Sequence, residues 1–148
     1  MPKPNLYLTL LLAAALVAGV SGAERPTGAE LKSILNALRV PVEKDLKPPI
    51  VFKIDHISEQ ADWAFMFGQP QRPGGKKVDY RHTRYSPAVK AGAFDDGICA
   101  LLQRRHGQWQ VVEYRIGATD VAWDGWDAKH KAPRAIFPYG PAAPPPGR

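Results

Sequence analysis

The sequence has 148 residues and a formal net charge of +6, and its single cysteine excludes a disulfide within the chain. This length indicates one domain with a modest core. The uncharged run from Leu6 to Val20 is shorter than the roughly twenty apolar residues that a membrane-spanning helix needs.

The first residues have the order of a secretory signal. Lys3 gives a basic start, the uncharged run follows, and small residues stand at Ser21 to Ala23. We therefore expect residues 1–23 to be a cleaved signal peptide and the mature protein to be periplasmic or secreted, with no membrane span after cleavage. The rest is expected to form one domain over residues 24–137 and a flexible, Pro-rich tail over 138–148.

A helix is predicted at the start of the domain. Thr27 and Glu30 have the spacing of a capping box. An apolar stripe runs from Leu31 to Leu38, and Pro41 is expected to end the helix near Arg39.

The middle of the chain predicts a first hairpin. Alternating apolar residues from Ile50 to Asp55 indicate one strand, and the aromatic run Trp63 to Phe67 indicates a second, with a turn near residues 58–61. The second strand is expected to end at residues 68–70. A short helical turn is predicted near Ser86 and Pro87.

A second hairpin is predicted over residues 97–116, with its turn at His106 and Gly107. This turn sets a register in which four side chains share one face, with Leu101 opposite Val112 and Cys99 opposite Tyr114. Cys99 is therefore expected to be buried and unreactive.

A last helix is predicted from Val121 to Pro133, capped by Thr119 or Asp120. The order of elements predicts the α+β class: a four-stranded antiparallel sheet built from two hairpins, with an N-terminal and a C-terminal helix packed on one face. In outline this arrangement is similar to cystatin-like and nuclear-transport-factor-like folds.

Several short stretches together resemble small exported bacterial proteins that are known mainly as uncharacterised sequences. The stretches are Trp63-Ala64-Phe65, Gly107-x-Trp109-x-Val111, residues 117–126 with Trp123 and Trp126, and Pro133-x-x-Ile136-Phe137. The resemblance covers most of the mature chain, and it implies no activity, cofactor or catalytic residue.

The positive charge is concentrated in one connection. Residues 69–94 hold six Lys and Arg against one Asp. This stretch is either a solvated loop or a contact for an anionic partner, such as an acidic glycan, a lipid headgroup or an acidic protein rather than nucleic acid. The candidate ligand-binding residues are five of these six basic side chains together with Trp109, which follows the hairpin turn: Arg72, Lys76, Lys77, Arg81, Arg84 and Trp109.

The four tryptophans are either core residues or a platform for a sugar or aromatic ring, and we favour the core for Trp63 and Trp126. Asp95 and Asp96 are adjacent, so in an extended segment they would point to opposite faces. Asp120 is either a helix cap or a site residue.

The histidines lack the spacing of metal ligands, and no catalytic set stands out, so we expect no metal and no other cofactor. The first hypothesis is therefore a binding module without enzymatic activity. The alternative is a small hydrolase in which Asp120 works with His56 or His82.

Overall fold

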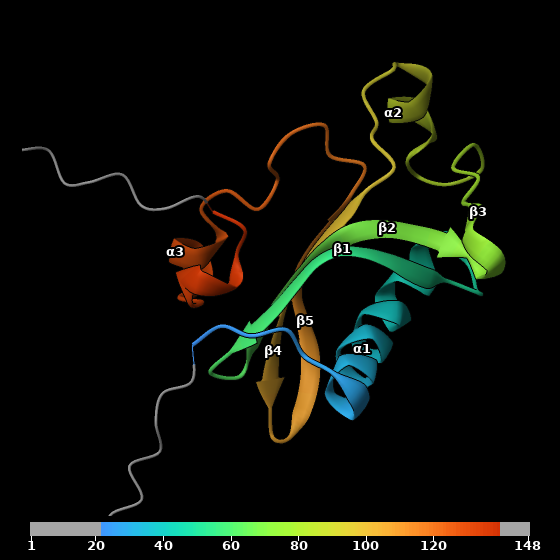
Figure 1. The fold of residues 1–148 in the computed structure, drawn as a ribbon. Coiled ribbons are helices and arrows are strands. Elements are labelled where there is room, and N and C mark those ends of the chain that lie inside the picture. Colours follow the sequence, from blue (N-terminus) through green and yellow to red (C-terminus); the bar gives the residue numbers. More distant parts are fainter. Residues whose placement is uncertain (1–21, 140–148) are drawn as a thin grey trace, which may run out of the picture.

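The computed structural model describes residues 22–139. Most of the predicted signal peptide (residues 1–21) and the tail from residue 140 lie outside the described residues. Between them lies an α+β fold with an antiparallel sheet in the order β1-β2-β4-β5, to which β3 adds a short fifth strand beside β2 (Figure 1). The elements are α1 Gly28–Leu46, β1 Val51–Gln60, β2 Trp63–Arg72, η1 Pro73–Gly75, β3 Lys76–Lys77, α2 Ser86–Lys90, β4 Ile98–Arg105, β5 Gln108–Ile116, α3 Trp126–His130 and η2 Arg134–Ile136.

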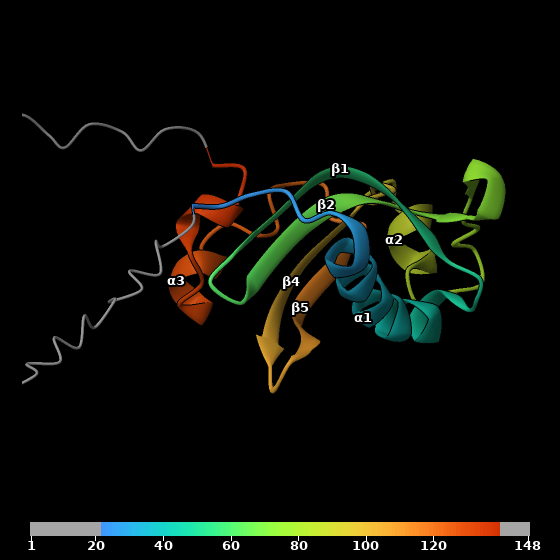
Figure 2. The same cartoon turned by 60° about the horizontal axis from the view of Figure 1, so that its bottom comes forward.

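The sheet is covered on both faces, which corrects the prediction that both helices share one face. Figure 2 shows α1 and α3 on opposite sides of the strands. Side chains alternate along each strand, so Ala64 and Met66 of β2 pack toward α1, whereas Phe65 and Phe67 pack toward the C-terminal segment. Two separate apolar clusters result, one on each face.

The helix α1 is longer than predicted, because it continues through Pro41 to Leu46. Proline inside a helix costs about 3 kcal/mol. Val42 and Leu46 are 0% and 2% exposed, and each buried side chain of this size contributes about 1.5 to 3 kcal/mol. The predicted capping box is also wrong, since Thr27 precedes the helix but its side chain makes no capping hydrogen bond.

The first hairpin turns at Ala61 and Asp62, slightly later than predicted, and both residues have positive φ. β2 runs past Pro70 to Arg72. Pro70 lies between the part of β2 that pairs with β4 and the part that pairs with β3. A residue without an N–H donor is tolerated there because β2 has no ladder partner on that side.

The second hairpin has its turn at His106 and Gly107, as predicted, and Arg105 faces Gln108. Between Leu101 and Leu102 of β4, a β-bulge in β5 leaves Val112 unpaired and shifts the register, so Leu101 faces Glu113 and Ala100 faces Tyr114. The predicted pairings of Leu101 with Val112 and of Cys99 with Tyr114 are therefore wrong, because a bulge adds one unpaired residue to a strand. Cys99 faces Arg115 instead.

The C-terminal segment covers the second face with less helix than predicted. α3 spans only Trp126–His130 and follows Gly125, which has a φ of 77°, so neither Thr119 nor Asp120 caps it. Successive turns fill residues 120–126 instead. Tyr139 packs on Phe137 with ring centroids 5.3 Å apart, so ordered contacts continue to the last described residue.

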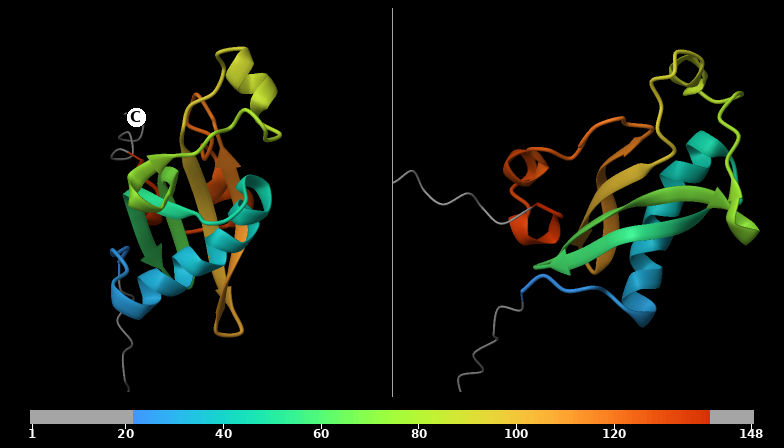
Figure 3. Two further views of the ribbon diagram at one scale, coloured as in Figure 1. Left: turned by 90° about the vertical axis from the view of Figure 1, so that its right-hand side faces the viewer. Right: turned by 45° about the horizontal axis from the view of Figure 1, so that its top comes forward.

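The connection between the hairpins stands out at one end of the sheet, where it carries β3 and α2 (Figure 3). The predicted short helix is present as α2, Ser86–Lys90. Within residues 22–139, no helix has the length and apolar character needed to cross a membrane.

Trp126 tests whether the C-terminal segment stabilises the fold. Its side chain is 4% exposed, so Trp126→Ala should lower the free energy of unfolding by about 3 to 5 kcal/mol. Val121→Ala is the control, because Val121 is 53% exposed and should change that free energy by less than about 0.5 kcal/mol. Urea titration measures both, and equal effects would show that the segment does not form a core.

Candidate functional site

The structure divides the predicted basic residues into two groups. The guanidinium groups of Arg81 and Arg84 form ion pairs of 2.7 Å with Asp79 and 2.8 Å with Asp45. Hydrogen bonds from Arg81 hold the pKa of the Asp79 carboxyl well below its usual range. Both arginine charges are therefore balanced by neighbouring carboxylates.

Arg72 has a structural contact but keeps its charge uncompensated. Its guanidinium donates hydrogen bonds to the carbonyl oxygens of Leu46, Lys47 and Pro49, at 2.8, 2.5 and 3.1 Å. These bonds satisfy carbonyl groups at and just beyond the C-terminal end of α1, which have no partner inside the helix. Carbonyl groups carry no net charge, so the positive charge of Arg72 remains.

Lys76 and Lys77 form β3 and are exposed. Lys76 lies opposite Arg72 in the pairing of β2 with β3. The hydrogen bond from Arg72 to the backbone carbonyl oxygen of Lys47 places Lys47 beside Arg72 as well. In the part of the chain that the structure describes, none of these lysines forms an ion pair. We call Lys47, Arg72, Lys76 and Lys77 the lysine edge.

Trp109, the remaining predicted site residue, lies apart from this edge. Its side chain is 9% exposed, and its Nε1 donates a 2.9 Å hydrogen bond to Glu30 Oε1. The Arg104 guanidinium also binds Glu30, at 2.7 Å, and lies over the Trp109 ring. Trp109 therefore helps to hold β5 against α1.

A second candidate site lies over one row of side chains that crosses the sheet. The sequence did not predict that these residues would be neighbours. The register places Phe67 opposite Cys99 and Cys99 opposite Arg115. Residues 117–123 fold over this row and leave a hollow of about 90 Å³, which we call the Trp123 hollow. It is lined by Phe67, Gly68, Gly97, Ile98, Cys99, Arg115, Ala118, Asp120, Ala122 and Trp123.

The aromatic wall of the Trp123 hollow is a stack of rings. Phe67 stacks on Trp123 with centroids 5.2 Å apart and an interplanar angle of 11°. His56 stacks on Phe67 with centroids 5.8 Å apart, again at 11°. The Nε2 atom of His56 is also 2.9 Å from the carbonyl oxygen of Ile136, so this histidine joins β1 to the C-terminal segment.

A larger, acidic hollow of about 350 Å³ adjoins the first. Asp55, Asp95 and Asp96 line it. The adjacent Asp95 and Asp96 do not point to opposite faces, as expected for an extended segment, because they lie in the turn before β4 and not in the strand. It shares four lining residues with the Trp123 hollow, namely Phe67, Gly68, Gly97 and Ala118. Among residues 22–139, no group of acids, histidines and cysteine is arranged to hold a metal ion.

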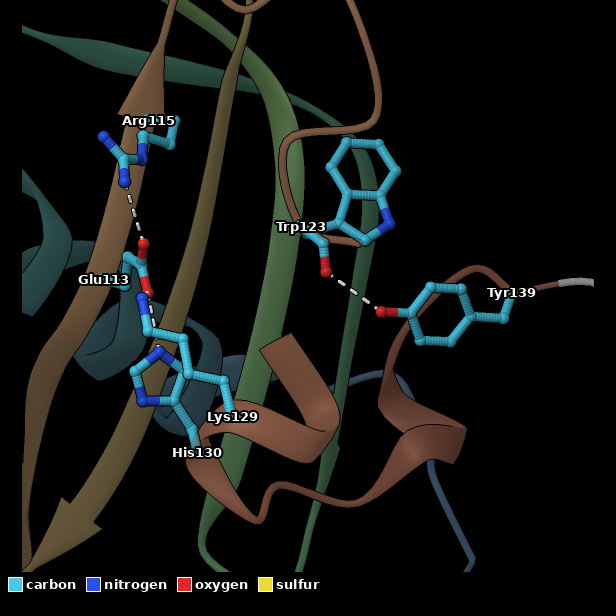
Figure 4. A network of polar contacts seen from close by, with 6 residues as sticks. All are labelled: Glu113, Arg115, Trp123, Lys129, His130 and Tyr139. Atoms are coloured by element: carbon cyan, nitrogen blue, oxygen red, sulfur yellow. Dashed lines mark hydrogen bonds and ion pairs between the residues drawn. The ribbon is translucent and has the colours of Figure 1, made fainter. Parts of the chain in front are cut away.

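Glu113 is the centre of a polar network on the same face (Figure 4). Its carboxylate lies 3.2 Å from Arg115 Nη2, 3.0 Å from Lys129 Nζ and 2.6 Å from His130 Nε2. Burial acts to raise the pKa of Glu113, but hydrogen bonds from His130 and Lys129 outweigh it and hold the pKa below its usual range. The network fastens α3 to β5.

Asp120 and the histidines do not come together as the hydrolase hypothesis requires. Asp120 is exposed and lines the Trp123 hollow. Of the two histidines in that hypothesis, His56 contacts the Ile136 carbonyl, and His82 is exposed in the connection between the hairpins. No hydrogen bond in the described range joins Asp120 to a histidine.

Comparison with known proteins assigns no relative: no protein-family profile matches the sequence, and no curated protein or solved structure is significantly similar to it.

Cys99 gives a direct test of the register across the sheet. Its side chain is 4% exposed, and burial raises the pKa of its thiol to about 11. Because the thiolate is the reactive form, we expect a disulfide reagent to leave the folded protein unmodified at pH 8 and to label it completely in urea. Rapid labelling of the folded protein would contradict the placement of Cys99.

The network around Glu113 should make stability depend on pH. Its pKa is lower in the folded than in the unfolded state, where it is about 4.3, so the stabilisation is present above that value and is lost as the pH falls through the folded pKa. At pH 7, Glu113→Gln should cost on the order of 1 to 3 kcal/mol. The difference from wild type should shrink in acid.

Urea titration at several pH values measures this difference. Asp124→Asn is the control, because Asp124 is exposed and its replacement should have little effect at any pH. A cost for Glu113→Gln that is the same at pH 7 and in acid would show that charge does not hold α3 in place.

Proposed function

We propose that this protein is an exported binding module that contacts an anionic partner through the lysine edge. The observation that carries the proposal is the exposure of Lys76 and Lys77 beside Arg72 and Lys47, with no carboxylate of residues 22–139 paired to any of the four. Four like charges at one end of a sheet repel one another, and an anionic surface relieves that repulsion. Outside the cytoplasm the anions available are acidic glycans, lipid headgroups and acidic proteins.

The ion pairs of the other basic residues support this edge, rather than the whole connection, as the proposed contact. Arg81 and Arg84 already have carboxylate partners, and breaking those pairs to bind another anion would offset the energy gained. Lys76 and Lys77 bring no such cost. Their short strand also follows the turn η1, so they lie at a protruding end of the sheet (Figure 1).

The hydrolase receives no comparable support. The histidine close to the Trp123 hollow, His56, is engaged by its ring stack and by the Ile136 carbonyl. We therefore favour binding without catalysis.

Reversing the charge of the edge tests the proposal. We expect the protein to be retained at low salt on immobilised heparin or on phosphatidylglycerol vesicles, and to elute as salt rises, because charges are screened over about 8 Å at physiological ionic strength. Lys76→Glu with Lys77→Glu should abolish retention while shifting stability by less than about 0.5 kcal/mol per site.

The matched control is Lys32→Glu with Lys131→Glu, which makes the same change in net charge at two other exposed positions. This control should remain largely retained. Equal loss in both double variants would show that only the overall charge matters, and retention that does not depend on salt would refute the electrostatic contact.

A further inference from the structure

The Trp123 hollow has features of a ligand site that the proposed function does not use. It is open to solvent, and its volume of about 90 Å³ is smaller than the roughly 150 Å³ of a cavity that encloses benzene. A six-membered ring would therefore be only partly enclosed. The acidic hollow beside it leaves room for the substituents of such a ring.

The apolar wall of this hollow is held in place. Trp123 is stacked on Phe67 and tilted against Phe65, with centroids 5.2 and 5.4 Å apart. The backbone carbonyl of Trp123 also accepts a 2.9 Å hydrogen bond from the Tyr139 hydroxyl (Figure 4). A fixed aromatic surface loses little conformational entropy on binding, which favours affinity.

Two polar groups of opposite charge line the same hollow. The Arg115 side chain is 61% exposed and uses Nη2 to contact Glu113, and a guanidinium has further N–H donors that stay available. Asp120 is exposed, and its carboxylate makes no hydrogen bond or ion pair to another described residue. The hollow thus offers a donor-only group and an acceptor-only group.

We propose that the Trp123 hollow binds the ring of a saccharide that carries no negative charge. A hydroxyl group both donates and accepts, so neighbouring hydroxyls on one ring satisfy Asp120 and Arg115 together, while the C–H face of the ring lies on the aromatic wall. An anion would be repelled by Asp120 and by the acids of the adjoining hollow. The charge of Arg115 is already balanced by Glu113, so the carboxylates decide the preference, and the lining disfavours an anionic ligand.

Three probes with the same ring and different charge test this directly: glucose, glucuronate and glucosamine. In NMR titrations of the isotope-labelled protein, glucose should shift the amide signals of Gly68, Gly97 and Ala118 and bind more tightly than glucuronate. Glucosamine should bind at least as tightly as glucose, because four carboxylates line the two hollows. Asp120→Ala and Arg115→Gln should each weaken glucose binding about tenfold or more, the usual effect of losing a hydrogen bond to a charged group.

Asp124→Ala is the matched control, because Asp124 lies in the same loop, is exposed and does not line the hollow. It should leave glucose binding unchanged. So should Lys76→Glu with Lys77→Glu, which separates this inference from the lysine edge. Absence of shifts at high millimolar glucose, tighter binding of glucuronate than of glucose, or equal weakening by Asp120→Ala and Asp124→Ala would overturn the proposal.

Discussion

The structure depends on a sheet that is apolar on both faces. Leu102 of β4 packs toward α1, whereas its neighbour Leu101 packs toward the C-terminal segment, and both are 0% exposed. Such a strand is stable only if both of its faces are covered. This requirement explains why α1 continues through Pro41, and why a segment with only five residues of α-helix is still held closely against the sheet.

Half-buried carboxylates hold the two helices that cover the sheet, α1 and α3, against its strands. Glu30 joins α1 to Arg104 and Trp109, and Asp45 joins the same helix to Arg84, Tyr85 and Tyr114. Glu113 does the same for α3 on the other face. The β5 bulge makes two of these contacts possible, because the extra residue turns Glu113 toward α3 and Tyr114 toward α1.

The parts of the fold that local signals determine could be predicted, and those that depend on distant packing could not. The turn at His106 and Gly107 follows from glycine in a tight hairpin, and the burial of Cys99 follows from strand alternation. The bulge beyond Leu101 has no local signal, so counting from the turn placed Tyr114 on the wrong face. The Trp123 hollow was missed for a related reason, since Phe67, Cys99 and Arg115 become neighbours only when three strands pair.

The Trp123 hollow, the acidic hollow and the lysine edge follow one another along one face of β2. This order favours two separate contacts. Phe67 lines the Trp123 hollow, Gln69 lines the acidic hollow, and Gln71 pairs with Lys77 of the lysine edge. Four residues of a strand span about 13 Å, which exceeds the Debye length of about 8 Å at physiological ionic strength. An anionic chain bound at the lysine edge would meet Asp55, Asp95 and Asp96 before it reached Trp123. The two proposed sites therefore suit different ligands, or a sugar ring and an anionic part of one ligand, and occupying one leaves the electrostatics of the other largely unchanged.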